Sequence, residues 1–491
     1  MKESNIFKKT AEGVKALKKR LPAEDILTYA FTSADGSSCA VLYADGMINK
    51  QLLGELVIHP LERLNLPPVG QKERKDVLLS ALYFPEIKES KEEKDAAMQI
   101  LDGNALLLVD GLGVGLVVGS KLLPVRAVTE PPTDVAVKGP REGFIEDIKT
   151  NMALIRKRLK TPDLRLETTR VGKRSGTAVC LCYLEGIVTP GVKEEVEKLL
   201  KETEIDCVPD SSYITELIAP RKHSLFRSVG TTERPDVLAC KLAEGRLGIL
   251  VDGSPIALTL PFAAVEDFQT AEDYYTSQFL ASLNRTLRII SAFIALLLPA
   301  FYLSSQLFKL QLLPLGLTLT IVEGTGRLPF SPSMETFAVL FVFEVLKEAS
   351  IRMPKYVGMS LSVVGALVLG EAAVSAGFLS TPTIIVVACS GICLYAVPNF
   401  VETGSMLRWI FLLIGGSVGP FGMTLLAAFT LYYLISSDRF GMPPLAPFSP
   451  LTPADLKDGV IKYDAYSLKK RPRILKSKNK TRLKYENERN G

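Results

Sequence analysis

The chain has 491 residues, of which 47% are hydrophobic and 23% are charged, and its formal net charge is +5. This length predicts about three domains, and so small a net charge gives no argument for nucleic-acid binding. The seven cysteines are scattered, without a Cys-x-x-Cys pair or a Cys/His cluster. This argues against a disulfide framework or a zinc site and favours free thiols in a reducing compartment.

Residues 1–24 predict a basic amphipathic arm, because lysine pairs alternate with apolar residues such as Phe7, Val14 and Leu17. The segment has no apolar core of signal-peptide length, so we expect this part of the chain on the cytoplasmic side. Two interpretations of the arm remain open. It is either a solvated extension or a contact with anionic lipid headgroups, at roughly 1 kcal/mol per basic residue near the surface.

Residues 25–135 and 136–262 predict two α/β subdomains, in which β-like runs such as SCAVLYA and ALLLVD alternate with helical segments. The two share an internal repeat. In each, an apolar helix ends at a glycine (Gly103 or Gly245), a strand ends in Val-Asp-Gly, and another strand follows. Glycine after a helix suits a left-handed C-cap, and Asp-Gly suits a hairpin turn. The subdomains are therefore predicted to be related.

Catalytic motifs are weak in this soluble region. The run GLGVGLVVG lacks the spacing of a dinucleotide loop, and VGKRSGT lacks the order of a phosphate loop. His59 and His223 are far apart in the sequence and have no evident catalytic or metal-binding partner. We therefore predict no enzyme activity, no catalytic residue, no metal site and no cofactor.

The joint, residues 261–305, connects this soluble region to an apolar one. Tyr275, Arg285 and Arg288 stand where headgroup anchors are expected, and the arginines favour a cytoplasmic location for this end. Acidic and aromatic residues precede the arginines. The candidates for coupling the two halves and for contacting the membrane surface are Glu266, Asp267, Asp273, Tyr274, Tyr275, Arg285 and Arg288.

Residues 263–440 predict a helical membrane domain. Two shorter apolar segments, 310–322 and 333–349, are expected to lie at the interface or to re-enter, and the second could line an aqueous path. Pro420 and the glycines around it predict a kink or a close helix contact in the last segment. Four segments are long enough to cross a hydrocarbon core of roughly 30 Å: 286–307, 356–378, 382–402 and 407–436.

The tail, residues 441–491, is basic, with twelve Lys/Arg against four Asp/Glu from residue 457 onward. This excess and an even number of crossings place both termini in the cytoplasm.

Three carboxylates are candidates for an ion path: Glu371, Glu344 and Glu348. Glu371 has small and apolar neighbours within two turns, and an ionised carboxylate in such surroundings requires a partner or water. The alternative for Glu371 is a structural hydrogen bond to a neighbouring helix.

Several long stretches carry a resemblance to one family. They include GPREGFIEDIKTNMALIRKRLK, KLAEGRLGILVDGSP, GRLPFSPSMETFAVLFVFEVLKEASIRMPKYVG and SDRFGMPPLAPFSP. Between about residues 100 and 460 the chain resembles the A subunits of GerA-type nutrient germinant receptors of endospore-forming bacteria. The chain departs from the family's pattern at Pro444, where an aromatic residue is common.

The resemblance implies a multi-pass subunit of the spore inner membrane, with its soluble region and both termini in the spore core. The expected partners are a transporter-like B subunit, a lipoprotein C subunit, further copies of the chain, the lipid membrane and a small nutrient, bound directly or through the B subunit. No nucleic-acid partner is expected. The resemblance implies an oligomeric, nutrient-gated ion channel. A ligand-binding receptor or a transporter-like subunit without its own conduction is the alternative.

Overall fold

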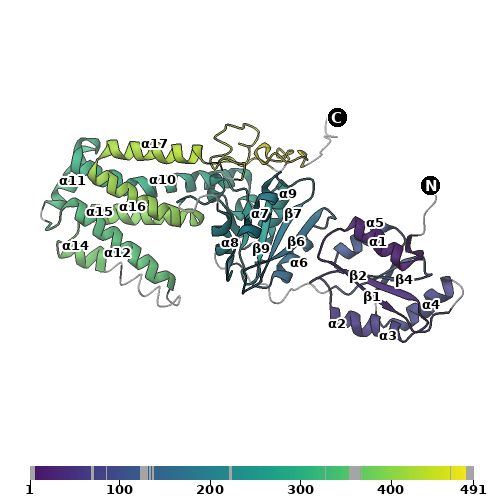
Figure 1. Cartoon of the computed structure of the whole chain (residues 1–491). Helices are drawn as coiled ribbons and strands as arrows, with labels where there is room; N and C mark the ends of the chain where they lie inside the picture. The colour runs from purple at the N-terminus through teal and green to yellow at the C-terminus, as the bar shows by residue number, and fades with distance from the viewer. Residues whose placement is uncertain are drawn as a thin grey trace.

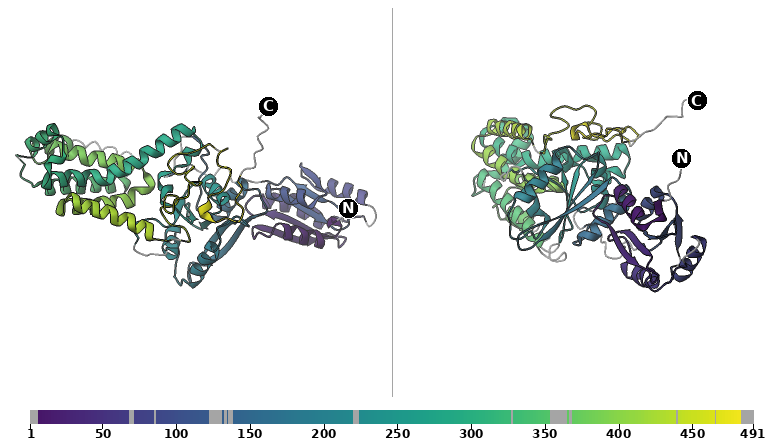
Figure 2. Two further views of the ribbon diagram at one scale, coloured as in Figure 1. Left: turned by 90° about the horizontal axis from the view of Figure 1, so that it is seen from above. Right: turned by 45° about the vertical axis from the view of Figure 1, so that its right-hand side comes forward.

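The computed structural model describes residues 6–67, 71–84, 86–121, 131, 134, 138–219, 224–326, 328–352, 365, 368–438, 440–464 and 466–482. Two units that each contain one β-sheet lie in a row with a C-terminal helical region (Figures 1 and 2). The second unit lies between the first unit and the helices. It is therefore the unit through which the soluble part meets the apolar part.

Both units are built on a five-stranded sheet with the same strand order, β1-β2-β4-β5-β3 and β6-β7-β9-β10-β8. Every pair of neighbouring strands is antiparallel. The prediction of two related subdomains is therefore confirmed. The strands are β1 (Ile26–Thr32), β2 (Ser38–Ala44), β3 (Ile87–Ser90), β4 (Ala105–Val109), β5 (Gly115–Val118), β6 (Leu164–Val171), β7 (Thr177–Leu184), β8 (Gly230–Thr232), β9 (Leu247–Val251) and β10 (Ala257–Leu260).

The repeated closing segment has the predicted geometry in both units. Helix α5 (Glu93–Leu101) and helix α9 (Pro235–Glu244) are each followed by a glycine with positive φ, +90° at Gly103 and +115° at Gly245. A Cβ at Gly245 would lie 2.7 Å from the Ile187 carbonyl oxygen. Glycine is required here both for its backbone conformation and for the close approach of the neighbouring chain.

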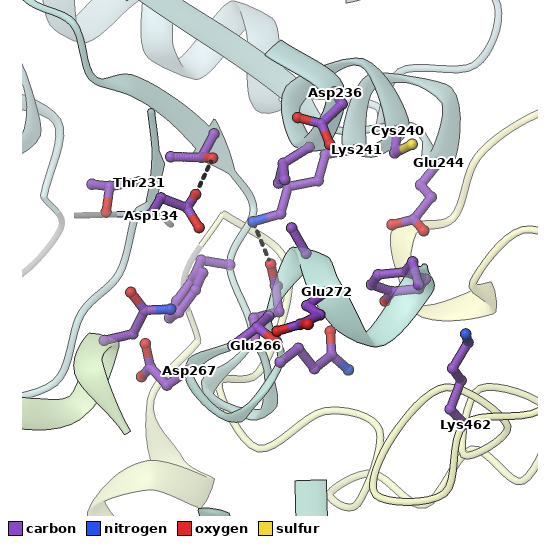
Figure 3. Close-up of a pocket in the computed structure, with 18 of the residues that line it drawn as sticks. Asp134, Thr231, Asp236, Cys240, Lys241, Glu244, Glu266, Asp267, Glu272 and Lys462 are labelled. Atoms are coloured by element: carbon purple, nitrogen blue, oxygen red, sulfur yellow. Dashed lines mark hydrogen bonds and ion pairs between the residues drawn. The ribbon is translucent and has the colours of Figure 1, made fainter. Parts of the chain in front are cut away.

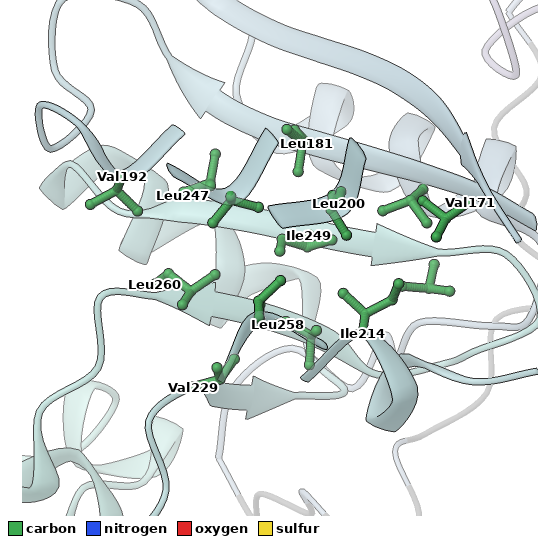
Figure 4. Close-up of a cluster of buried hydrophobic side chains, with 14 of the residues drawn as sticks. Val171, Leu181, Val192, Leu200, Ile214, Val229, Leu247, Ile249, Leu258 and Leu260 are labelled. Atoms are coloured by element: carbon green, nitrogen blue, oxygen red, sulfur yellow. The ribbon is translucent and has the colours of Figure 1, made fainter. Parts of the chain in front are cut away.

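Each sheet carries helices on both faces, because successive strand residues point to opposite sides. In the second unit, one face packs against α7 (Val192–Glu202) and α8 (Ser211–Ile218), as Figure 4 shows. The other face packs against α6 (Ile148–Arg158) and α9. In the first unit, α1 (Thr10–Arg20) and α5 cover one face. The opposite face packs against α2 (Lys50–Leu53), the π-helical turn that follows it, α3 (His59–Glu62) and α4 (Gln71–Ala81).

The structure corrects both interpretations of the N-terminal arm. Phe7, Leu17 and Leu21 are at most 2% exposed and belong to the core of the first unit, together with Leu108. Helix α1 also lies at the end of the molecule far from the helical region (Figure 1). The amphipathic pattern of the segment therefore serves to pack its apolar side on the first sheet.

A buried ion pair fixes the two units to each other. Arg156 of α6 is 1% exposed, and its Nε and Nη2 donate to the Asp25 carboxylate at 2.9 and 2.7 Å. Glu24 accepts a hydrogen bond from the Thr168 backbone N–H at 2.8 Å. Because β6 is an edge strand, this contact also satisfies a backbone donor that has no strand partner on that side.

The helical region begins with α10 (Gln278–Phe308). At 1.5 Å per residue its 31 residues measure about 46 Å, more than the roughly 30 Å of a hydrocarbon core. Within the described residues, α10 is the one helix that is long and apolar enough to cross a membrane alone. The others are α11 (Leu315–Thr325), α12 (Pro332–Arg352), α14 (Ala373–Ser375), α15 (Thr381–Tyr395), α16 (Val401–Ser417) and α17 (Pro420–Ser436).

Two of the predicted crossings are broken. The segment predicted at 382–402 is α15, which ends at Tyr395, and α15 and the following segment 398–417 are bent by 108°. The prediction of one crossing over 407–436 is wrong, because Gly419, with φ +79°, separates α16 from α17. The interruption expected at Pro420 is confirmed. Within the segment predicted at 356–378, residues 356–364, 366 and 367 lie outside the described residues.

The tail is folded onto the rest of the chain, whereas the sequence showed only its charge. Met442, Ala446 and Leu475 form a small apolar cluster with Ala263. Arg471 Nε donates to the Ala243 carbonyl of α9 at 2.7 Å. The described part of the tail therefore covers the place where the second unit meets α10 (Figure 1).

We predict that Arg156→Met lowers the free energy of unfolding by about 3–5 kcal/mol, because it leaves Asp25 as a buried charge without its partner. The control is Arg174→Met, whose ion pair with Asp206 leaves 84% and 68% of the two side chains exposed. It should change the stability by less than about 1 kcal/mol. Urea denaturation followed by circular dichroism measures both. Equal losses in the two variants would contradict a structural role for the Arg156–Asp25 pair.

Candidate functional site: the charged joint between the second unit and the helices

Two 3-10 turns connect the second sheet to α10, namely η3 (Ala264–Phe268) and η4 (Ala271–Tyr274). In each turn a carboxylate accepts a backbone N–H at the start of the turn. Glu266 bonds the Ala263 N–H at 2.8 Å, and Asp273 bonds the Thr270 N–H at 3.1 Å. Each acid thus caps its own turn, because these N–H groups have no partner within the turn.

Glu266 binds the joint to the second unit. Its carboxylate lies 2.6 Å from Arg246 Nη1 and 2.9 Å from Lys241 Nζ, and the glutamate is 8% exposed. Burial alone would raise the pKa of Glu266, but Arg246 and Lys241 outweigh it and hold the pKa below its ordinary value. Lys241 belongs to α9, and Arg246 lies between α9 and β9. The ionised Glu266 therefore attaches the joint directly to the repeated closing segment.

Asp273 binds the joint to α10. Its two carboxylate oxygens lie 3.0 Å from Arg285 Nε and 2.7 Å from Arg288 Nη2. Burial raises the pKa of Asp273, but hydrogen bonds from Arg288 and from the Thr270 N–H outweigh it, so the pKa is below its ordinary value of 3.8. The prediction that Arg285 and Arg288 anchor to lipid headgroups is wrong. Arg285 is 0% exposed, and both arginines point into the protein.

The tail supplies the third part of this cluster. Asp458 accepts from Arg285 Nη1 and from the Tyr274 hydroxyl, each at 2.9 Å. Lys462 Nζ donates to the Asp273 carbonyl at 2.6 Å. Sequence reasoning missed both tail residues, because Asp458 is one of few acids in a basic segment whose charge alone was interpreted.

Tyr275 also differs from the expected headgroup anchor. Its hydroxyl donates to Asp236 Oδ2 at 2.5 Å, and the same oxygen lies 2.9 Å from Arg234 Nη2. Tyr275 therefore connects the end of η4 to α9. Of the seven residues predicted for the joint, all lie in one connected region between α9, α10 and the tail.

A cavity of about 1030 Å³ lies in this region. The second unit, the joint, the tail and the break between α15 and α16 all contribute to its wall (Figure 3). Its carboxylates include Glu244, Glu266, Asp267 and Glu272. Burial raises the pKa of Asp267 to about 7, and attraction to Arg227 offsets only part of that rise. The site therefore combines tightly paired carboxylates with one that titrates near neutral pH.

A second contact joins the soluble part to the helices. It involves the tip, which we define as residues 396–400 between α15 and α16. Arg227 Nη1 donates to the Asn399 carbonyl at 3.2 Å, and the rings of Phe268 and Phe400 lie 5.9 Å apart. The Thr403 hydroxyl donates to the Leu225 carbonyl at 2.8 Å. The second unit and the joint therefore contact the tip and the start of α16 as well as α10.

The ion-path candidates lie apart from the joint. Glu344 of α12 is paired with Arg408 of α16 and with Lys347, and it accepts a hydrogen bond from Ser405 at 2.7 Å. Arg408 is 0% exposed, and its Nη1 donates to Ser390 at 3.1 Å. This network cross-links three helices. Sequence reasoning missed Arg408, although it is a lone arginine in an apolar segment.

The other two candidates are more accessible. Glu348 is paired with Arg352 one turn away at 2.6 Å, with 57% of its side chain exposed. Glu371 lies in a π-helical turn, residues 368–372, and is exposed. The structure does not bring Glu344, Glu348 and Glu371 into one cluster with the joint.

The second sheet unit is fixed through the ion pairs of the joint to a helical region that contains a bilayer-length apolar helix, so the chain combines a sheet-containing part with an apolar helical part. Residues 15–474 match a family described as Bacillus/Clostridium GerA spore germination protein. The chain belongs to this family.

Several known proteins are similar to this chain. Spore germination protein KA of Bacillus subtilis is 33% identical over 90% of this chain and 82% of its own. The uncharacterized membrane protein YfkQ of the same organism is 32% identical, and the match covers 91% of this chain and 87% of YfkQ. The crystal structure of the N-terminal domain of the A subunit of the Bacillus megaterium spore germinant receptor GerK3 is 27% identical, with a TM-score of 0.40, over 51% of this chain and 94% of that one.

We predict that Asp273→Asn destabilises the joint by about 3–5 kcal/mol, because the buried Arg285 loses one of its two carboxylate partners and Arg288 loses its own. Amide hydrogen exchange in residues 455–463 and 278–290 should increase. The exposed Asp464→Asn is the control. Since the pKa of Asp273 is lowered in the fold, its contribution is present above about pH 4 and is lost as the pH falls through the folded pKa. A difference from wild type that grows in acid would contradict this assignment.

Proposed function

We propose that the chain is the A subunit of a nutrient germinant receptor of the spore inner membrane, with several membrane crossings and both termini in the spore core. Membership of the GerA family carries the proposal. The joint supports the placement of the second unit and the tail on the same side of the membrane. Helix α10 begins at the second unit, and the tail folds back onto it. In this proposal a small nutrient binds to this subunit or to a transporter-like B subunit. A lipoprotein C subunit completes the receptor.

The proposed mechanism is an oligomeric ion channel, with copies of the chain arranged around an ion path. Glu371 supports it, because this carboxylate is exposed in the π-helical turn of an apolar segment of the single chain. In a membrane such a group must face water or another polar group. Contacts between copies would provide this environment. The paired Glu344 would then hold α12 and α16 together beside the path, while Glu348 would lie toward its end.

The joint is proposed to couple nutrient binding to this path. Asp273 and Glu266 hold α10 and the second unit in one arrangement, and a ligand shifts such an arrangement only by binding one state more tightly than another. The residues proposed to carry the coupling are Glu266, Asp267, Asp273, Tyr274, Tyr275, Arg285 and Arg288.

The alternative is a receptor or transporter-like subunit without conduction. The cavity at the joint favours a ligand-binding receptor, since about 1030 Å³ is enough for a small molecule. Calorimetry of the full chain against candidate nutrients separates the two. Tight binding without any conductance would favour the receptor.

We predict that the purified chain in liposomes conducts cations, because the oligomer supplies an aqueous path through the bilayer. The measurement is the current across the vesicle membrane as the protein-to-lipid ratio is increased, with protein-free vesicles as the control. Absence of current, together with single copies of the chain in the membrane, would exclude the channel.

We predict that Glu371→Gln slows nutrient-triggered cation release from spores severalfold, since it removes a charge from the proposed path. The matched control is Glu204→Gln in the second unit, whose ion pair with Lys173 is exposed. Cation efflux from spores that carry each variant tests this. Unchanged release in Glu371→Gln would remove this residue from the path.

A further inference from the structure

Two neighbouring carboxylates of η3 have different ionic surroundings. Glu266 is bound tightly by Arg246 and Lys241 at 2.6 and 2.9 Å. Asp267 is 9% exposed, and its ion pair with Arg227 Nη1 measures 3.5 Å. Among the residues that the structure describes, Asp267 forms no second ion pair. Asp267 is therefore the weakly compensated member of the pair.

The partner of Asp267 is shared with the helical region. Arg227 Nη1 also donates to the Asn399 carbonyl of the tip at 3.2 Å, and Nη2 contacts the Thr231 hydroxyl. The guanidinium lies 5.9 Å from the centre of the Phe262 ring. One cation thus serves both the carboxylate of the joint and the tip of the broken helix pair.

We propose that Asp267 is a proton-sensitive latch between the second unit and the tip. The neutral carboxyl keeps the tip seated on the second unit, and its ionisation opens the neighbouring cavity to water. The physical reason is that a buried carboxylate with one long, shared ion pair is destabilised relative to a hydrated one. When the tip separates from the second unit, water reaches the Asp267 carboxylate. For its effect on ion flow the latch rests on the proposed function, but the movement itself does not.

The titration of Asp267 has the direction that the latch requires. Burial raises its pKa to about 7, with Arg227 and Lys241 lowering the pKa and Glu266 raising it. These charges lie on the loop before β8, on α9 and on η3. From α10, Arg288 bonds the neighbouring Phe268 carbonyl at 2.7 Å. The tip contributes the uncharged Pro398 and Asn399 to the cavity wall.

The sign of the pH effect follows from linkage. A hydrated aspartate titrates near pH 4, so the closed joint holds a proton that the open joint releases. Closure is therefore favoured most below about pH 4, and this preference is lost as the pH rises through about 7. Between pH 6 and pH 8 the ratio of open to closed joint should increase about tenfold.

The chain contains one tryptophan, Trp409 on α16, whose ring lies 5.7 Å from that of Phe337. The experiment follows Trp409 fluorescence and amide exchange in residues 396–404 of the full chain in lipid nanodiscs between pH 5.5 and 8.5. Exchange in β7 corrects for the intrinsic effect of pH. The wild type should show a transition near pH 7, and Asp267→Asn should remain closed throughout.

Glu266→Gln is the matched control. It removes a neighbouring negative charge but retains Asp267, so the transition should persist with its midpoint at lower pH. If Asp267→Asn does not fold, Arg227→Gln is the second variant. It removes an attraction that stabilises the ionised form, so the midpoint should move to higher pH.

A transition that persists in Asp267→Asn, an unchanged midpoint in Arg227→Gln, or no transition in the wild type overturns the latch. These readouts need no ion flux. A normal transition in a chain that gives no current in liposomes would therefore contradict the channel and leave the latch supported.

Discussion

The salt-bridge cluster around Asp273 is the interaction on which the arrangement of the two halves depends. Its carboxylate binds Arg285 and Arg288 of α10, and Arg285 extends the cluster to Asp458 of the tail. The neighbouring segments η4 and α10 thus meet the distant tail in one buried cluster of charges. Because a fully buried arginine is stable only with its partners in place, the tail, the joint and the first turns of α10 must be positioned together.

The joint therefore has two connections of different strength to the helices. The connection through Asp273 is built from short, multiple hydrogen bonds and is suited to hold α10 in a fixed position. The connection to the tip has one charged group, Arg227, which is shared between Asp267 and the Asn399 carbonyl, beside the Phe268–Phe400 ring contact and the Thr403–Leu225 hydrogen bond. A structure held firmly at one helix and weakly at a neighbouring tip permits the tip to move while the rest stays in place. The bent α15–α16 pair is the element best placed to move when the contacts of the second unit change, because its bend lies against that unit.

The related sheet units show how far sequence reasoning reached. The glycines at the helix ends and the Asp-Gly turns between paired strands were identified correctly, since a positive φ depends on local chemistry. The prediction for Arg285 and Arg288 was wrong because their partners depend on distant parts of the chain. A short run of arginines before an apolar segment is the same whether its partners are lipid phosphates or buried carboxylates. The partner Asp458 is 173 residues away from Arg285, and no local pattern connects them.

The division into two halves of different polarity, the repeat within the first half and the resemblance to the GerA family could be predicted from the amino-acid sequence alone. These features follow from composition, periodicity and long stretches of similarity, none of which depends on how the segments are arranged in space. Three features could be seen only in the folded chain: the N-terminal helix belongs to the core, the tail is folded onto the joint, and Arg408 pairs with Glu344. Burial and ion pairing depend on which distant segments are brought together. The sequence does not distinguish a charged residue in solvent from the same residue in the protein interior.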